Sequence, residues 1–240
     1  MRDFDAVVFD MDGVIFDSEH ATLECWMELA EKYAIPDIKT PYYACIGVTM
    51  QRTREIMMEA YGPDFPYDAY AREASAMFHE KYDGGRLPMK GGVTEILKFL
   101  KEAGVKIALA SSTRKETVTR ELREAGILSY FDELVCGDMV QRSKPAPDIF
   151  LLACEKAGVE PGRAYAIEDS YNGIRAAAAG GLRPIMVPDM LPADAEMREL
   201  AEAVLEDLNA VLEYLKMAEN KKNTKKRKKS KKVLAFYFEL

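Results

Sequence analysis

Histidine and cysteine are scarce in this sequence of 240 residues, and long apolar runs are absent. The chain has two histidines and four cysteines, and no two cysteines are spaced as in a zinc or redox motif. This scarcity excludes a structural zinc site and a disulfide scaffold, and it predicts four reduced thiols, Cys25, Cys45, Cys136 and Cys154. Because no stretch of about 18 apolar residues occurs, we expect no membrane span, no signal peptide and a cytoplasmic protein.

Positive charge is scarce outside one segment near the C-terminus. Nine of the 33 lysines and arginines lie within residues 221–232, so residues 1–220 hold 24 basic side chains against 39 acidic ones. Such an acidic surface repels nucleic acid and anionic membranes. The basic segment has no interleaved aromatic residues, and we interpret it as part of a disordered tail over 217–240. We therefore expect no nucleic-acid partner.

Apolar residues in the C-terminal two thirds of the chain alternate between helix and strand patterns. Val93, Ile96, Leu97 and Leu100 share one helical face, and a short apolar run of strand length follows. The continued alternation predicts strands at 6–9, 106–110, 134–136, 164–167 and 184–187 and further helices at 114–125, 148–157 and 172–179. Short buried strands that alternate with helices are typical of a doubly wound parallel sheet, the Rossmann-like α/β class.

Residues 18–84 contain no strand pattern. They hold three helical stripes of apolar residues, separated by prolines and followed by the Gly84–Gly85 pair. We therefore predict an all-helical cap domain over 18–84, inserted into an α/β core that is formed by 1–17 and 85–216. The methionines and aromatic residues of the stripes have the spacing of a buried helix face, so we interpret them as core and not as cofactor contacts.

Polar side chains directly follow several of the predicted strands. In an open parallel sheet, ligands bind at the carboxyl ends of the strands, so these side chains should line one crevice. A single aspartate at a strand end is often only a helix cap, and it is the joint placement that favours a catalytic site. The expected site residues are Asp10, Asp12, Ser111, Ser112, Lys144, Glu168 and Asp169.

Four carboxylates in one crevice predict a metal ion. Like charges at close range raise one another's pKa values, so all four stay ionised only beside a cation. Oxygen ligands without histidine or cysteine suit a hard cation, and Mg²⁺ is the expected cofactor. Lys144 and the serine hydroxyls add a positive charge and donors, which together suit a phosphate. The expected metal site consists of Asp10, Asp12, Glu168 and Asp169.

Four segments resemble, in the same order, the signature motifs of the haloacid dehalogenase-like hydrolase superfamily. They are Phe-Asp-Met-Asp-Gly-Val at 9–14, Leu-Ala-Ser at 109–111, Ser-Lys-Pro-Ala-Pro-Asp-Ile-Phe at 143–150 and Ile-Glu-Asp-Ser at 167–170. The resemblance covers residues 1–216 and is strongest to the subgroup of β-phosphoglucomutase and the small sugar- and polyol-phosphate phosphatases. It implies an α/β core with a helical cap inserted after the first motif.

The resemblance implies a role for each acidic residue. Asp10 would attack phosphorus to form an aspartyl-phosphate, and Asp12 would protonate the leaving alcohol and then deprotonate the incoming water. Mg²⁺ would be held by Asp10, the backbone carbonyl of Asp12 and Asp169, with Glu168 close by. Dehalogenases of the superfamily lack the second aspartate, so Asp12 indicates phosphate-ester chemistry.

The activity implied by the resemblance is Mg²⁺-dependent hydrolysis of a small phosphorylated metabolite, a sugar or polyol phosphate, by a monomer or weak dimer. Ser111, Ser112 and Lys144 would hold the transferred phosphoryl group. The alternative is a sugar phosphomutase of the β-phosphoglucomutase type. The cap histidine and cap arginine of that enzyme fall on Thr22 and near Met50, which cannot gate a general acid or bind a second phosphate, so a phosphatase is favoured. His20 and Arg52, each two residues away, could partly replace the two missing groups if the register were shifted.

The cap segments Glu19–Thr22 and Ile46–Met50 are expected to contact the leaving group and set specificity.

One further class of protein has similar chemistry. A receiver-type signalling domain also places a phosphorylated aspartate, an acidic pair, a hydroxyl and a lysine on a parallel sheet. In that class the phosphorylated aspartate follows the acidic pair by some strands and no cap is present, whereas here the aspartates open the chain.

Overall fold

The computed structural model describes residues 3–48 and 50–219, which form a sheet of six parallel strands in the order β3-β2-β1-β4-β5-β6. The central strand β1 is buried throughout because its four residues are apolar on both faces. This arrangement confirms the predicted doubly wound parallel α/β class. The strands are β1 (Ala6–Phe9), β2 (Lys106–Ser111), β3 (Glu133–Cys136), β4 (Ala164–Glu168), β5 (Arg183–Met186) and β6 (Ala203–Val204).

Helices cover both faces of the sheet. Along β1, Val7 and Phe9 pack with α5, α6 and a C-terminal helix over 208–219, whereas Ala6 and Val8 pack with α7 and α8. The side chains divide in this way because successive residues of a strand point to opposite faces. The helices are α5 (Val93–Glu102), α6 (Lys115–Glu124), α7 (Asp148–Ala157), α8 (Tyr171–Ala179) and α9 (Ala195–Leu200), with short 3₁₀ turns at Leu128–Tyr130, Gly137–Met139 and Pro161–Arg163.

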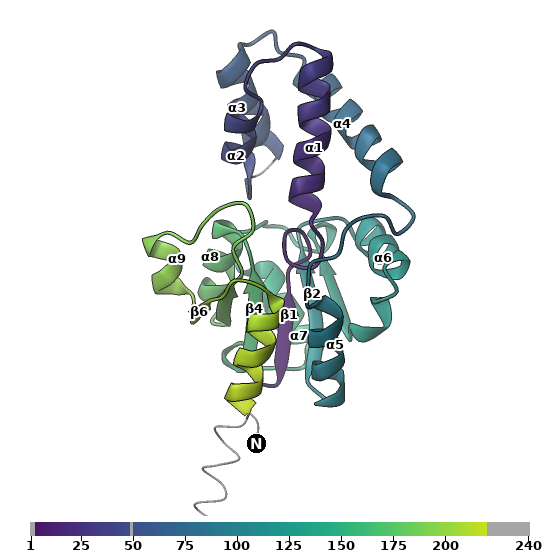
Figure 1. Ribbon diagram of the computed structural model, residues 1–240. Helices are drawn as coiled ribbons and strands as arrows, with labels where there is room; N and C mark the ends of the chain where they lie inside the picture. The colour runs from purple at the N-terminus through teal and green to yellow at the C-terminus, as the bar shows by residue number, and fades with distance from the viewer. Residues whose placement is uncertain (1–2, 49, 220–240) are drawn as a thin grey trace, which may run out of the picture.

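Four helices inserted between β1 and α5 stand above the carboxyl ends of the strands (Figure 1). We call them the cap. They share an aromatic cluster in which Trp26 packs edge to face on Tyr42 and Tyr70, with ring centroids 5.3 and 5.5 Å apart. This cluster gives the cap a hydrophobic centre of its own. The helices are α1 (Ser18–Lys32), α2 (Lys39–Cys45), α3 (Met50–Tyr61) and α4 (Tyr67–Tyr82).

The cap has one helix more than the three that the apolar stripes predict. Pro41, which we predict to separate helices, lies instead in the first turn of α2. Proline is tolerated there because the first N–H groups of a helix have no partner within the helix. The adjacent Tyr42 is buried against Trp26, so tertiary packing and not local pattern determines this short helix.

The chain after β5 contains elements that the sequence patterns do not predict, namely α9, β6 and the helix over 208–219. β6 has two residues, too few for a recognisable apolar run. The last helix packs Leu208, Val211 and Leu215 on the sheet and continues through residues 217–219, which we predict to belong to the disordered tail. Residues 220–240, the rest of that predicted tail, lie outside the described part of the chain.

Two expectations from composition can be compared with the structure. All four cysteines are free thiols, as predicted, and Cys25, Cys136 and Cys154 are buried. Across residues 3–48 and 50–219, no helix combines the length and the apolar character needed to cross a membrane.

Candidate active site

The predicted site residues gather where the sheet faces the cap. Asp10 directly follows β1, and its backbone N–H donates to the carbonyl of Ile167 in β4 at 2.9 Å, which keeps the two strand ends together. A cavity of about 440 Å³ opens at this edge, and we call it the central cavity. The core side of the central cavity includes Asp10, Asp12, Ser112, Lys144, Asp169 and Asn172.

Lys144 is buried between two carboxylates. Its Nζ donates to Asp10 Oδ1 and to Glu168 Oε1, both at 2.5 Å, and to the carbonyl of Ala110 at 3.0 Å. The side chain is only 8% exposed. Burial alone would lower the pKa of Lys144, but the charges of Asp10 and Glu168 raise that pKa above its usual range. Lys144 is therefore a fixed positive charge beside Asp10.

Glu168 has a full set of hydrogen-bond donors. Besides the bond from Lys144 to one carboxylate oxygen, the other oxygen accepts from the N–H of Asp169 at 3.1 Å, the N–H of Ser170 at 3.1 Å and the Ser170 hydroxyl at 3.0 Å. A Cβ at Gly173 in α8 would lie 1.9 Å from Glu168 Oε1, so glycine is required for the helix to fit beside the carboxylate. Glu168 is thus a fixed partner for Lys144.

Asp169 differs from Glu168 because its carboxylate has no hydrogen bond or ion pair within the described part of the chain. The residue is 7% exposed and lines the central cavity. Burial, followed by the charges of Glu168 and Asp10, raises the pKa of Asp169 well above its usual value. Gly13, with φ of 75°, allows the close approach, since a Cβ there would lie 2.4 Å from Asp169 Oδ2. An ionised Asp169 lacks a matching positive charge.

The carboxylates of Asp10, Glu168 and Asp169 could hold a metal ion. Each offers one oxygen that lies within 4.8 Å of the other two. Burial raises the pKa of Asp10 to about 8, against the opposing charge of Lys144. Because the Glu168 oxygens already accept four hydrogen bonds, the oxygens best able to bind a cation belong to Asp10 and Asp169. Three buried acids beside one lysine fit a hard divalent cation.

Asp12 is separate from this acidic cluster. Its Oδ1 accepts a hydrogen bond from the Ser18 hydroxyl at 2.8 Å, and its Oδ2 accepts one from the Thr113 hydroxyl at 2.9 Å. Ser18 begins α1 of the cap, whereas Thr113 follows β2 of the core. Three of the four predicted carboxylates offer oxygens close enough to share a metal ion. These two hydroxyls hold the side chain of Asp12 at the boundary between cap and core, where it lines the central cavity with Asp10 and Asp169.

The two predicted serines differ in their surroundings. Ser111 is fully buried, and its hydroxyl accepts the N–H of Thr113 at 3.1 Å. Ser112 is exposed and lines the central cavity, which Ser111 does not. The structure therefore brings Ser112 to the cavity with Asp10 and Lys144, whereas Ser111 supports the turn after β2.

The cap closes the central cavity with residues from both predicted segments. Glu19 lines it from α1, and Gly47 and Met50 line it from the second segment. Asn172 of α8, which we do not predict as a site residue, also lines it and donates from Nδ2 to the carbonyl of Gly47. The sequence offers no signal for this contact, because it depends on where the cap rests on the core.

Three buried acids share one fixed lysine at the edge of a parallel sheet where ligands bind, and such an excess of buried negative charge is typical of an enzyme site. Burying carboxylates without enough positive charge beside them lowers the stability of the fold, and a bound cation can offset that loss. The chain belongs to the haloacid dehalogenase-like hydrolases, since the model of that family matches residues 4–181.

Several relatives of known name support this membership. The phosphorylated carbohydrates phosphatase of Thermotoga maritima is 34% identical over 185 residues, which are 75% of this chain and 83% of that protein. The β-phosphoglucomutase of Bacillus subtilis is 30% identical over 225 residues, 90% of this chain and 98% of that protein. The family hydrolase structure from Deinococcus radiodurans, with bound phosphate and sodium, has a TM-score of 0.75 at 28% identity and covers 91% of this chain and 97% of its own. This chain falls among the phosphoric monoester hydrolases of the family.

Proposed function

We propose that the chain is a Mg²⁺-dependent phosphatase that hydrolyses a small phosphorylated sugar or polyol through an aspartyl-phosphate. The observation that carries this proposal is the pairing of Asp10 with Lys144 beside the unpaired carboxylate of Asp169. Lys144 therefore holds the carboxylate of Asp10, which would act as the nucleophile, and Asp169 offers a binding place for Mg²⁺ beside it. The names of the phosphatase relatives support the same substrate class.

Asp10 would attack the phosphorus atom, and the bond between phosphorus and the alcohol oxygen would break. Lys144 holds Asp10 Oδ1 and offsets repulsion between the carboxylate and the phosphate dianion. Mg²⁺, held by Asp10 and Asp169, would supply further positive charge at the transferred group. Ser112, which lines the central cavity, would contact the phosphoryl oxygens.

Asp12 would move the protons in both halves of the reaction. In the first half it gives a proton to the leaving alcohol, and in the second it takes a proton from the water that attacks the aspartyl-phosphate. The hydroxyls of Ser18 and Thr113 fix both carboxylate oxygens, so the side chain has a defined orientation. Release of inorganic phosphate then restores Asp10.

Phosphate release is expected only when a divalent cation is present. In an assay of phosphorylated sugars and polyols, EDTA should abolish the activity and added Mg²⁺ should restore it, because Asp10 and Asp169 need a cation to stay ionised together. Released phosphate is measured against enzyme that was never exposed to EDTA. Full activity in metal-free buffer would contradict a cation site shared by these carboxylates.

Phosphatase and mutase activities can be separated by the fate of the phosphoryl group. A mutase must hold a second phosphate, yet Lys144 is the only cationic side chain among the described residues of the central cavity, and it already pairs with two carboxylates. Met50 lines that cavity without offering a charge. With β-glucose 1-phosphate and a trace of the 1,6-bisphosphate, we expect free phosphate to exceed glucose 6-phosphate. Faster formation of glucose 6-phosphate would identify a mutase.

A further inference from the structure

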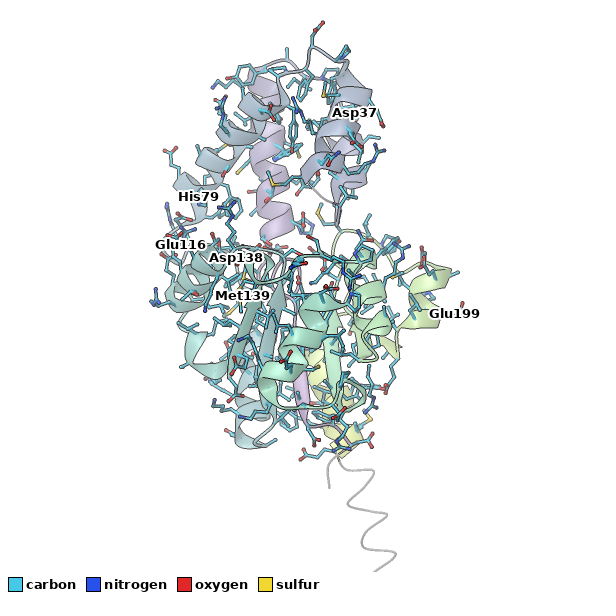
Figure 2. The ribbon with its side chains drawn as sticks, turned by 180° about the vertical axis from the view of Figure 1, so that it is seen from behind. Asp37, His79, Glu116, Asp138, Met139 and Glu199 are labelled. Atoms are coloured by element: carbon cyan, nitrogen blue, oxygen red, sulfur yellow. The ribbon has the colours of Figure 1, made fainter. Side chains whose placement is uncertain are left out.

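A second cavity, of about 290 Å³, lies between α1 and α4 of the cap and α6 of the core. We call it the side cavity. Figure 2 shows this boundary from behind, with His79 at the base of the cap and Glu116 on the core helix below it. Asp12 and Glu19 line both cavities, so the two spaces adjoin at these residues. The remaining walls include Trp26, Ser75, Phe78, His79, Thr117 and Glu121.

Glu121 places a carboxylate that lacks hydrogen-bond donors in the wall of the side cavity. The residue is 9% exposed, and its carboxylate accepts no hydrogen bond from any described residue. The guanidinium of Arg120 comes no nearer than an Nη2 to Oε1 distance of 4.0 Å. The carboxylate thus has one cation at the limit of ion-pair distance and no hydrogen-bond donor, and a ligand can supply the missing donors. Burial, and then the charge of Asp12, raises the pKa of Glu121 to about 7.

The described walls of the side cavity carry no lysine or arginine. Three carboxylates, those of Asp12, Glu19 and Glu121, face the space together with hydroxyl groups. Tyr42 supplies one donor to Glu19, through a bond of 3.0 Å from its hydroxyl to Oε2. A second phosphate in this space would meet three carboxylates, of which one is paired with Arg120, whereas a hydroxyl or ammonium group would find acceptors.

We propose that the side cavity receives the leaving group of the substrate, and that Glu121 determines specificity by accepting hydrogen bonds from its hydroxyl or ammonium groups. This inference rests on the proposed phosphatase function. The phosphoryl group occupies the central cavity, Asp12 protonates the bridging oxygen, and the alcohol lies on the far side of Asp12. The preferred substrates are then monophosphates of uncharged polyols and of amino sugars, and bisphosphates are excluded.

The test compares four esters with the full chain and Mg²⁺: phenyl phosphate, sorbitol 6-phosphate, glucosamine 6-phosphate and fructose 1,6-bisphosphate. The phenyl group of phenyl phosphate carries no hydrogen-bond donor for Glu121. The kcat/KM for this ester therefore measures only the part of the site that binds the phosphoryl group. In the wild type, we expect kcat/KM for sorbitol and glucosamine 6-phosphates to exceed that for the bisphosphate. The Glu121→Gln variant should lower their kcat/KM, relative to phenyl phosphate, by about 10- to 100-fold, as for loss of a hydrogen bond to a charged group.

Glu116→Gln is the matched control, because Glu116 is exposed on the same helix and the change in charge is the same. Its ratio of kcat/KM values should equal that of the wild type. A second variant, Thr117→Lys, places a cation in the wall and should raise the relative kcat/KM for the bisphosphate. An equal loss on all esters in Glu121→Gln, or a wild-type preference for the bisphosphate, would overturn the inference. If no ester is hydrolysed, the proposed function itself fails.

Discussion

The Asp10→Asn variant is expected to release no measurable phosphate from any ester while keeping the thermal stability of the wild type. The amide has nearly the shape of the carboxylate but cannot act as the nucleophile, and loss of a nucleophile costs about 10⁴- to 10⁶-fold in kcat. Stability should persist because the change removes one of three clustered acids, and Lys144 keeps Glu168 as its partner. Turnover and the melting temperature are measured on the same preparation.

Turnover within about tenfold of the wild type would contradict this expectation. Loss of a general acid or base already costs about 10²- to 10⁴-fold, so a smaller loss would exclude Asp10 as the nucleophile. A variant that is inactive and also unfolded would leave the nucleophile unproven by this route. Asp10→Glu then provides the second measurement. It keeps the charge beside Lys144 but shifts the attacking oxygen, so it should fold and lose most of its activity.

The Lys144→Met variant is expected to lose both activity and stability. Methionine matches the length of the lysine stem, but Asp10 and Glu168 are left without their buried cation. Removing one partner of a buried ion pair costs about 3–5 kcal/mol in the free energy of unfolding. Urea unfolding at neutral pH without added metal measures this loss. The matched control is Lys98→Met, on the exposed side of α5.

The dependence on pH distinguishes lost charge pairing from lost packing. The pKa of Asp10 is already raised to about 8 in the presence of Lys144. An acid with a raised pKa in the folded state binds its proton more readily when folded, so its burial destabilises the fold more as pH rises. The part of the Lys144→Met deficit that comes from the charge of Asp10 should therefore grow as pH rises above about 8, where Asp10 ionises in the wild type, and vanish below that pH. A deficit that does not change with pH would assign the effect to packing.

The sheet and the acidic cluster could be predicted because both follow from short-range signals. Apolar runs such as Ala6–Phe9 are too short for helices, and their alternation with helical stripes requires parallel strands. Parallel strands end on one edge of the sheet, which brings Asp10 and Asp169 together although they are distant in sequence. Lys144 lies on a loop, and its position in the site could be predicted from the Ser-Lys-Pro motif that contains it.

The remaining features depend on how the cap rests on the core, which local pattern does not encode. The carboxylate of Asp12 is held by the hydroxyls of Ser18 and Thr113, one from each side of that boundary. Glu121 belongs to a helix rich in charge, so its sequence indicates a solvated face. It is buried because the cap and core enclose the side cavity. Prediction from sequence thus reached the core half of the site and the two cap segments that line the central cavity, but missed Asn172, Glu121 and the hydroxyls that hold Asp12.

Gly173 limits how this fold can be made more thermostable. Replacing a glycine within a helix by alanine ordinarily stabilises a protein by about 1 kcal/mol, and Gly173 lies in α8 with no positive φ that would forbid a side chain. Its Cβ would nevertheless overlap the carboxylate of Glu168 and displace the partner of Lys144. A residue with higher helix propensity is therefore excluded at position 173 by the carboxylate of Glu168. Room for a methyl group exists instead at Gly91 and Gly162, which also lack a positive φ and where the nearest atoms lie 4.0 and 3.9 Å from the added Cβ.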